Sequence, residues 1–233
     1  KRKMKHIFDT SECSTHDKLH NFTKYVRRQD IARFLCQTEI FKKQINIKGS
    51  IVECGVHQGG SIMTWGHLTA TLEPYNYHRK IIGFDTFEGF PSIHKSDGDT
   101  ENVRVGNFSE DFDTYEELMK CIELYDNNRF LNDQNKIQLI KGDALKTIPE
   151  YVKNNKHLIV SLLYLDFDLY EPTVAALRSL LPRIPKGGII VFDEVNNKEW
   201  PGETLALIDE MGLNNNRLEC FDFEPNISFI QID

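Results

Sequence analysis

The sequence lacks the marks of several large protein classes. Its 233 residues contain five cysteines, an odd number, and no Cys-x-x-Cys pair, so neither a disulfide framework nor a zinc site is indicated. No stretch approaches the roughly 18 consecutive apolar residues of a membrane span. Acidic residues outnumber basic ones and give a formal charge of −7. This charge disfavours nucleic acid and anionic membranes as partners, because both are bound through clustered Lys and Arg.

We also expect no secretion signal at the start of the chain. The basic residues from Lys1 to His6 are followed by a polar stretch without an apolar segment of signal-peptide length. We therefore expect a protein of the reducing cytoplasm that binds neither nucleic acid nor a membrane. A chain of this length can bury an ample core, and we predict a single domain over residues 1–233.

Helices are predicted near the N-terminus. From about Asn21 to Lys43 apolar residues recur at helical spacing with basic residues between them, and we interpret residues 1–48 as an N-terminal helical cap. The apolar positions are Phe22, Val26, Ile31, Phe34, Leu35 and Ile40. Weak candidates for an acceptor pocket, with a solvated helix face as the alternative, are Tyr25, Arg27 and Arg28.

A βαβ unit follows these helices. Residues 50–55 form a short apolar run typical of a buried strand. Gly59 and Ser61 open a helix that reaches about Leu72, and residues 80–85 form the second strand. A strand, a helix and a strand at this spacing predict a parallel, right-handed unit.

The rest of the chain predicts an insertion and the remainder of a sheet. Residues 92–132 are mostly polar around one predicted helix, and a segment of this length inside a compact domain is typical of a lid. The pattern as a whole predicts an α/β fold with a mostly parallel sheet and helices on both faces. The further elements are a helix at 114–125, strands at 136–141 and before Asp166 and Asp193, a helix at 172–181, and an antiparallel hairpin formed by 217–223 and 226–230.

A glycine-rich loop after the first strand predicts a cofactor site. The loop runs Glu53-x-Gly55-x-x-x-Gly59-x-Ser61, and its spacing differs from the Gly-x-Gly-x-x-Gly of a dinucleotide site. Glycines let the backbone approach a ligand, and the start of a helix offers free N–H groups. His57 is a candidate contact for a cofactor carboxylate, with a solvent-facing position as the alternative.

Two aspartates at the next strand ends extend this site. Asp85 closes the second strand, where a carboxylate can accept from both ribose hydroxyls, and Asp143 follows the third, where it can accept from an exocyclic amine. The arrangement resembles an S-adenosylmethionine site, with Glu53 near the amino-acid moiety and Gly55 and Gly59 beneath it. Plain turn roles for Asp85 and Asp143 are the alternative.

Two neighbouring strands each end in a pair of carboxylates. Asp166 and Asp168 follow one strand, and Asp193 and Glu194 follow the other. Ligands of an open parallel sheet lie outside the carboxyl ends of its strands, so these four acidic side chains are expected to face one point. All-oxygen ligands favour Mg²⁺, Mn²⁺ or Ca²⁺ over zinc. Acidic residues also suit turns, but two such pairs favour a cation and a proton acceptor.

Several motifs resemble those of one enzyme family. They are Tyr25-Val-Arg-Arg-Gln-Asp-Ile-Ala-Arg-Phe-Leu, Val52-Glu-Cys-Gly-Val-His-Gln-Gly-Gly-Ser, Gly83-Phe-Asp-Thr-Phe-Glu-Gly-Phe-Pro, Leu165-Asp-Phe-Asp-Leu-Tyr-Glu-Pro-Thr and Trp200-Pro-Gly. Over about residues 20 to 210 the chain resembles the macrocin O-methyltransferases, which are metal-dependent, S-adenosylmethionine-using sugar O-methyltransferases of macrolide and aminocoumarin pathways. The resemblance implies a class I methyltransferase fold, Rossmann-like, with a seven-stranded sheet.

The resemblance also implies roles for the carboxylates. The family pattern makes Asp166, Asp193 and Glu194 the metal ligands and Asp168 the general base. The chain departs from that pattern at two positions, because the family usually has an aspartate in place of Glu194 and a glycine in place of Phe167. The longer side chain of Glu194 changes how the third metal ligand would reach the cation. The bulky ring of Phe167 changes the shape of the acceptor pocket.

Together these features predict a divalent-metal-dependent O-methyltransferase that uses S-adenosylmethionine to methylate a sugar or a glycosylated small molecule. A cation chelated by two neighbouring hydroxyls acidifies one of them while Asp168 takes its proton. A catechol-type O-methyltransferase is the alternative, since an aromatic diol chelates the same ion, and a dinucleotide-binding oxidoreductase or a non-enzymatic binding module is weaker. Trp200 is expected either over the mouth of the site or in the core. A homodimer is the candidate assembly.

Overall fold

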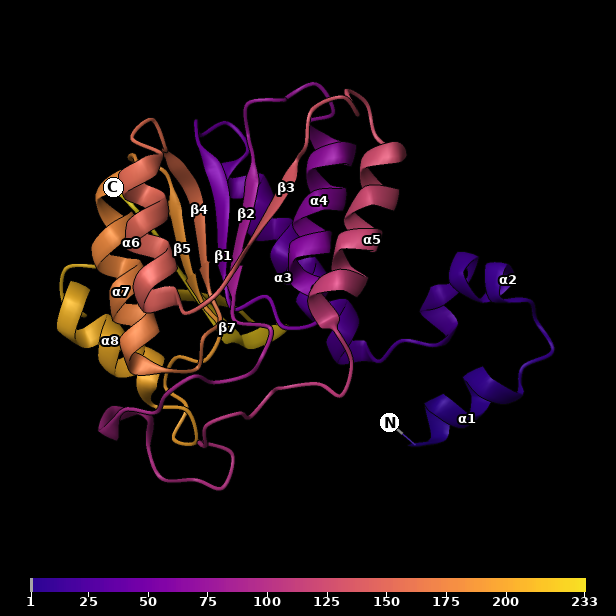
Figure 1. The fold of residues 1–233 in the computed structure, drawn as a ribbon, viewed down its shortest axis with the longest axis horizontal. Coiled ribbons are helices and arrows are strands. Elements are labelled where there is room, and N and C mark those ends of the chain that lie inside the picture. Colours follow the sequence, from indigo (N-terminus) through magenta and orange to yellow (C-terminus); the bar gives the residue numbers. More distant parts are fainter. Residues whose placement is uncertain (1) are drawn as a thin grey trace.

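The chain folds around one seven-stranded sheet. A computed structural model describes residues 2–233, and its strands lie in the order β3-β2-β1-β4-β5-β7-β6 (Figure 1). Neighbours from β3 to β5 are parallel, whereas β7 is antiparallel to β5 and β6. This is the mostly parallel sheet that the sequence predicted. The strands are β1 (Ser50–Cys54), β2 (Ile81–Asp85), β3 (Ile137–Lys141), β4 (Val160–Leu165), β5 (Ile189–Phe192), β6 (Glu219–Phe221) and β7 (Glu224–Gln231).

Helices cover both faces of the sheet (Figure 1). Successive strand residues point to opposite faces, so Ile51 packs into one helix layer and Val52 into the other. The helices of the first layer are α3 (Arg28–Gln44), α4 (Gly60–Leu72) and α5 (Thr114–Asn127). Those of the second layer are α6 (Ala144–Asn154), α7 (Tyr170–Leu180), which continues into the 3₁₀ turn η3 (Leu181–Arg183), and α8 (Gly202–Met211).

The predicted strands and the C-terminal hairpin are confirmed, with ends that differ by up to three residues. Two helices, α6 and α8, have no counterpart in the prediction. α6 contains Pro149 in its interior, a residue that normally ends a helix. α8 begins directly after Pro201, in a stretch that also contains Gly202. The sequence at its start therefore predicts a turn and not a helix.

The helix α3 is present, but its buried face differs from the predicted one. Phe34 and Leu35 were expected inside, yet they are 43% and 46% exposed. The buried face includes Cys36 together with the polar Gln37 and Gln44. These glutamines make polar contacts with the rest of the domain, so the apolar spacing of α3 marks only part of its buried side, where Ile40 lies as predicted.

The residues before α3 lie apart from the sheet. Figure 1 shows α1 (Arg2–Thr10) and α2 (Thr15–His20) projecting away from it, and the 3₁₀ turn η1 (Phe22–Lys24) leads back to the domain. Within this segment the rings of Phe8 and Tyr25 meet edge to face at 5.1 Å. Of the cap predicted over residues 1–48, α3 is therefore the part that covers the sheet, while Lys1 lies outside the described residues.

The predicted lid over residues 92–132 divides into two parts. α5 buries Leu118 and Ile122 in the core, so this part is a layer helix that connects β2 to β3 and not a lid. The part before it is a long loop that contains the 3₁₀ turn η2 (Lys95–Asp97). Asp97 is buried and accepts hydrogen bonds from the backbone N–H of Tyr170 at 2.6 Å and of His94 at 2.7 Å. The loop is therefore tied to the start of α7.

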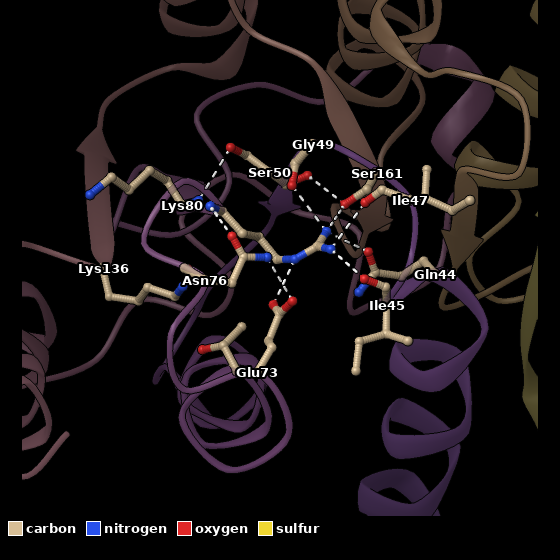
Figure 2. Close-up of polar contacts among 12 residues, drawn as sticks. Gln44, Ile45, Ile47, Gly49, Ser50, Glu73, Asn76, Lys80, Lys136 and Ser161 are labelled. Carbon is tan, nitrogen blue, oxygen red and sulfur yellow. Dashed lines mark hydrogen bonds and ion pairs between the residues drawn. The ribbon is translucent and has the colours of Figure 1, made fainter. Parts of the chain in front are cut away.

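A buried arginine, Arg79, joins the elements at the other end of the strands. Figure 2 labels several of its partners, among them Gln44, Glu73 and Ser161. Arg79, which precedes β2, donates to the carbonyl oxygens of Ile45 and Ile47 at 2.9 and 3.0 Å. It also donates to the carbonyl oxygen of Gly49 at 3.0 Å and forms an ion pair with Glu73 at 2.6 Å. One side chain thus binds the carbonyls after α3, the end of α4 and the start of β1. Its other partners are Gln44 and Ser161.

We expect Arg79→Met to lower the free energy of unfolding by about 3–5 kcal/mol, because it leaves Glu73 as an uncompensated buried charge. Urea unfolding followed by circular dichroism measures the change. The control is Arg178→Met, whose side chain is 69% exposed and pairs with Glu210, and which should cost about 1 kcal/mol or less. Equal losses in the two variants would contradict the role given to Arg79.

Candidate functional site

The carboxyl ends of the parallel strands open onto one cavity. Its volume is about 520 Å³, within the range of roughly 300–1,000 Å³ that small-molecule sites usually have. This is also where an open parallel sheet places its ligands. The predicted residues that line the cavity are Gly55, Ser61, Asp85, Asp143, Asp166, Asp168, Asp193 and Glu194.

Two other predicted residues, Glu53 and Gly59, lie behind the wall of the cavity. Glu53 on β1 is fully buried, and burial raises the pKa of its carboxyl to about 8 against the opposing effect of Ser61 and Trp65. A Cβ at Gly59 would stand 2.4 Å from the side chain of Leu118 on α5. In this structure neither residue lines the cavity, and the ligand contact expected of Glu53 stays a prediction.

Gly55 brings the ends of two strands together. Its φ is +93°, in the region that favours glycine. An added Cβ would lie 1.9 Å from the backbone oxygen of Asp166. The glycine is therefore required by the contact between the end of β1 and the end of β4, before any ligand is considered.

The two aspartates predicted to hold a nucleoside also order their own loops. Asp85 accepts from the backbone N–H groups of Val56, His57 and Phe87 at 2.7, 2.8 and 2.6 Å. An ionised carboxylate offers about four acceptor positions, so Asp85 keeps one toward the cavity. Asp143 caps α6 by accepting from the N–H of Leu145 at 3.0 Å. Both aspartates therefore combine a turn role with a place in the cavity wall.

The glycine-rich loop is also held from α3. The buried side chain of Gln37 donates to the hydroxyl of Ser61 at 2.5 Å. Ser61 lies in the first turn of α4 and lines the cavity. The loop that faces the predicted cofactor is thus held by side chains of two other elements, Asp85 and Gln37.

Arg33 of α3 binds the carboxylates that follow β4 and β5. Its guanidinium lies 2.7 Å from Asp193 Oδ1 and 2.9 Å from Asp166 Oδ2, with a second contact to Asp193 Oδ2 at 3.2 Å. Tyr164 on β4 accepts from Arg33 at 3.0 Å and donates to Asp193 at 2.7 Å. Burial and the charge of Asp193 raise the pKa of Asp166, and Arg33 opposes this effect.

Asp168 stands apart from this ion-pair cluster. Its φ is +59°, an uncommon value for a residue other than glycine, so Asp166 and Asp168 are not alternating positions of an extended strand. Both nevertheless line the cavity. Burial raises the pKa of Asp168 to about 7, and the charges of Asp193 and Glu194 add to the shift.

A buried glutamate holds both carboxylate-bearing strand ends in place. Glu203 in the first turn of α8 is fully buried. Its Oε1 accepts from the N–H groups of Phe167 and Asp168 at 3.1 and 3.2 Å, and its Oε2 accepts from the N–H of Glu194 at 3.2 Å. The positions of Asp168 and Glu194 therefore depend on this one side chain.

The predicted metal ligands offer oxygen atoms from two adjacent strand ends. Asp166, Asp193 and Glu194 all line the cavity, and an all-oxygen donor set suits a hard divalent cation. Within residues 2–233, however, no three His, Cys, Asp or Glu side chains already stand as a cation-binding group. Arg33 binds Asp166 and Asp193, and Glu194 accepts from the side chain of Asn197 at 2.5 Å. The donor chemistry fits, but the arrangement contains a guanidinium that the sequence analysis did not place there.

Aromatic rings line the mouth of the cavity. Trp200 lies 6.0 Å from the rings of both Phe90 and Phe108, which stand 5.2 Å from each other. All three residues line the cavity, so of the two positions expected for Trp200 the structure has the one at the site and not the one in the core. His57 also lines it and packs against Phe108 at 5.6 Å.

Sequence reasoning missed Arg33 and Glu203. Arg33 lies in the amphipathic stretch from Asn21 to Lys43 and inside the motif that begins at Tyr25, but the periodicity of α3 gives no reason to place it in a site. Glu203 had a usable signal, because it lies beside the buried Gly202 and one turn before Ala206 and Leu207. An acidic residue on the apolar face of a helix is seldom buried without a partner.

The sequence profile of the family described as Macrocin-O-methyltransferase (TylF) matches residues 21–207. Over 151 residues, 64% of this chain and 53% of the relative, the chain is 28% identical to the 8-demethyl-8-(2,3-dimethoxy-alpha-L-rhamnosyl)-tetracenomycin-C 4'-O-methyltransferase of Streptomyces olivaceus. It is 25% identical over 152 residues, with the same shares, to the demethyldecarbamoylnovobiocin O-methyltransferase of Streptomyces niveus. The chain spans about half the length of these curated relatives.

Solved structures are similar over almost the whole chain. The crystal structure of CalS11, a calicheamicin methyltransferase, matches 99% of this chain and 90% of its own with a TM-score of 0.95 at 29% identity. The apo structure of CalS11, described as a TDP-rhamnose 3'-O-methyltransferase of calicheamicin biosynthesis, matches 99% and 92% with a TM-score of 0.86 at 28% identity.

We expect Glu203→Gln to lower the free energy of unfolding by about 1–3 kcal/mol, because the amide group replaces an acceptor that backbone N–H groups face. Denaturant unfolding measures the loss. Asp209→Asn on the same helix is the control, since the exposed residue keeps an oxygen for the hydroxyl of Tyr170. Matching stabilities of the two variants would contradict the tethering role of Glu203.

Proposed function

This chain belongs to the macrocin O-methyltransferase family and has the class I methyltransferase fold, and from that premise we propose that it transfers the methyl group of S-adenosylmethionine to a hydroxyl of a sugar or a glycosylated small molecule. The observation that carries this proposal is a single cavity in which a glycine-rich loop and two nucleoside-type aspartates meet four carboxylates at the next strand ends. A cofactor and an acceptor can then share one enclosed space.

The cofactor would lie along the ends of β1, β2 and β3. Gly55 and Ser61 would face its amino-acid part, with the free N–H groups at the start of α4 near its carboxylate. The remaining acceptor position of Asp85 suits a ribose hydroxyl, and Asp143 suits the adenine amine. This assignment is supported by the place of all four residues in the cavity wall.

The reaction is an in-line displacement at the sulfonium methyl group. As the acceptor oxygen bonds to the methyl carbon, the carbon–sulfur bond breaks and the hydroxyl proton passes to Asp168 as the general base. Asp168 suits this role because it faces the cavity without an ion-pair partner among residues 2–233, whereas Asp166 and Asp193 are engaged by Arg33. Holding cofactor and acceptor together removes most of the orientational barrier.

A divalent cation such as Mg²⁺ would be held by Asp166, Asp193 and Glu194. When bound, it supplies the charge that acidifies a hydroxyl ligated to it. The support is the all-oxygen donor set on two adjacent strand ends, and Mn²⁺ or Ca²⁺ satisfies the same donors. Glu203 would serve this site by fixing the backbone on both sides of it.

The acceptor class rests on relatives and on the shape of the mouth. The relatives are described as acting on a rhamnosyl tetracenomycin, on a novobiocin precursor and on TDP-rhamnose. Aromatic rings such as Trp200 and Phe108 give the mouth of this cavity flat apolar surfaces, which commonly pack against sugar rings. The loop before α5 and Phe167 would then set which sugar is accepted.

S-adenosylmethionine should bind chelator-treated protein, because the loop of Gly55 and Ser61 and the aspartates Asp85 and Asp143 are distinct from the carboxylate cluster. Isothermal titration calorimetry tests this, with NAD as the comparison ligand that should give no heat. Binding that appears only after Mg²⁺ is added would show that the cofactor and cation sites are one.

Replacing the general base should stop the chemistry and spare binding. We expect Asp168→Asn to lower methyl transfer to a nucleotide-linked or glycosidic rhamnose by roughly 10²–10⁴-fold, the usual range for a lost base, with cofactor affinity retained. Asp166→Asn should instead weaken Mg²⁺ affinity, and excess Mg²⁺ should restore part of its activity. Near wild-type turnover of Asp168→Asn would rule out this base, and faster turnover of a catechol than of any sugar would change the acceptor class.

A further inference from the structure

The guanidinium of Arg33 uses the same carboxylate oxygens that a cation would need. It binds Asp193 through both oxygens, at 2.7 and 3.2 Å, and Asp166 through Oδ2 at 2.9 Å. These two residues are also two of the three proposed cation ligands. A carboxylate oxygen that accepts from a guanidinium in this geometry has less electron density to offer a cation, and the two positive charges repel each other.

The position of Arg33 is compatible with movement. Its side chain is 40% exposed and lines the cavity. The buried Arg79, at the amino ends of the strands, is in contrast 3% exposed. The carboxylates that it binds are more enclosed, with side chains 24% exposed for Asp166 and 8% for Asp193. Arg33 therefore has room on its open side, and its two partners do not.

A counter-charge is needed when no cation is bound. Asp166 and Asp193 follow neighbouring strands and are bridged by one nitrogen, and Tyr164 donates to Asp193 from beneath. Two carboxylates that are close enough to share one nitrogen repel each other in a partly buried site. A guanidinium with several donors in a fixed plane is suited to hold both in one geometry.

We propose that Arg33 is a positioning residue that competes with the cation: it holds Asp166 and Asp193 together while the site is free of metal, and it releases at least one of them when a divalent cation binds. The inference rests on the proposed cation dependence of the reaction. It assigns to Arg33 both a benefit, because the carboxylates are pre-positioned, and a cost, because its bonds must break before the cation is fully ligated.

The competition is tested by metal binding and not by turnover. Chelator-treated wild type, Arg33→Met and Arg33→Lys are titrated with Mg²⁺ by calorimetry and with Mn²⁺ by electron paramagnetic resonance of the free ion. Arg33→Met should bind Mg²⁺ at least about 10-fold more tightly, since charge-assisted hydrogen bonds to the same carboxylate oxygens no longer oppose binding. Arg33→Lys, which keeps the charge but loses the planar fork, should lie between the two. Arg178→Met serves as the surface control and should match wild type.

A second measurement separates competition from a merely structural role. Without metal, Arg33→Met should melt at a lower temperature than wild type, because Asp166 and Asp193 lose their counter-charge. Saturating Mg²⁺ should raise its melting temperature by more than that of wild type and close the gap. A gap that persists unchanged would mean that Arg33 supports the fold alone, and it would overturn the proposal.

The outcomes also distinguish this inference from the proposed function. Equal or weaker Mg²⁺ affinity of Arg33→Met, with normal binding to wild type, overturns the competition and leaves cation dependence intact. Binding to Arg33→Met with none to wild type supports the competition and overturns cation dependence of the natural chain. Absence of binding to every variant overturns both.

Discussion

Repulsion between like charges is the constraint on which this site is arranged. The ends of β4 and β5 carry Asp166, Asp168, Asp193 and Glu194 into one cavity, and Glu203 lies buried behind them. Such a group is stable only if each charge is compensated or neutralised. The chain uses backbone N–H groups for Glu203, a guanidinium for Asp166 and Asp193, and an amide for Glu194. Asp168 is left over, which is why burial leaves its pKa near 7.

The two ends of the sheet carry different tasks. At the amino ends of the strands Arg79 joins α3, α4 and β1 through bonds that are almost fully buried, and the result is a rigid base. At the carboxyl ends the polar groups face a cavity and stay partly exposed.

The sequence predicts the scaffold better than it predicts the partners within the site. Strands such as β1 and β4 can be predicted from the sequence, because burial on both faces requires continuous apolar runs. Strand ends also read clearly, so that acidic residues like Asp85 and Asp166 could be placed in one cavity from their position alone. Contacts between side chains of different elements produce no periodic pattern in the sequence. Arg33 meets Asp193 across 160 residues, and although it lies in the motif that begins at Tyr25, the spacing of its helix does not identify this partner.

Glu53 illustrates a different limit. Its place on β1 beside the glycine-rich loop predicted a ligand contact, but strand alternation turns it into the core next to Trp65. The sequence gives the strand, while the face that a residue takes depends on which helix layer packs there. The same limit applies to α3, where polar residues that bind other elements occupy part of the buried face.

The contact between Gly55 and Asp166 has a consequence for comparative biology. Since any side chain at position 55 would collide with the backbone of the neighbouring strand, this glycine should persist in homologues that have lost the ability to bind a cofactor. Its invariance in a family would therefore record a junction between two strands and carry no information about activity. Degenerate or regulatory relatives of this fold are better recognised by changes at Asp168, a position where the proposed chemistry requires an acid.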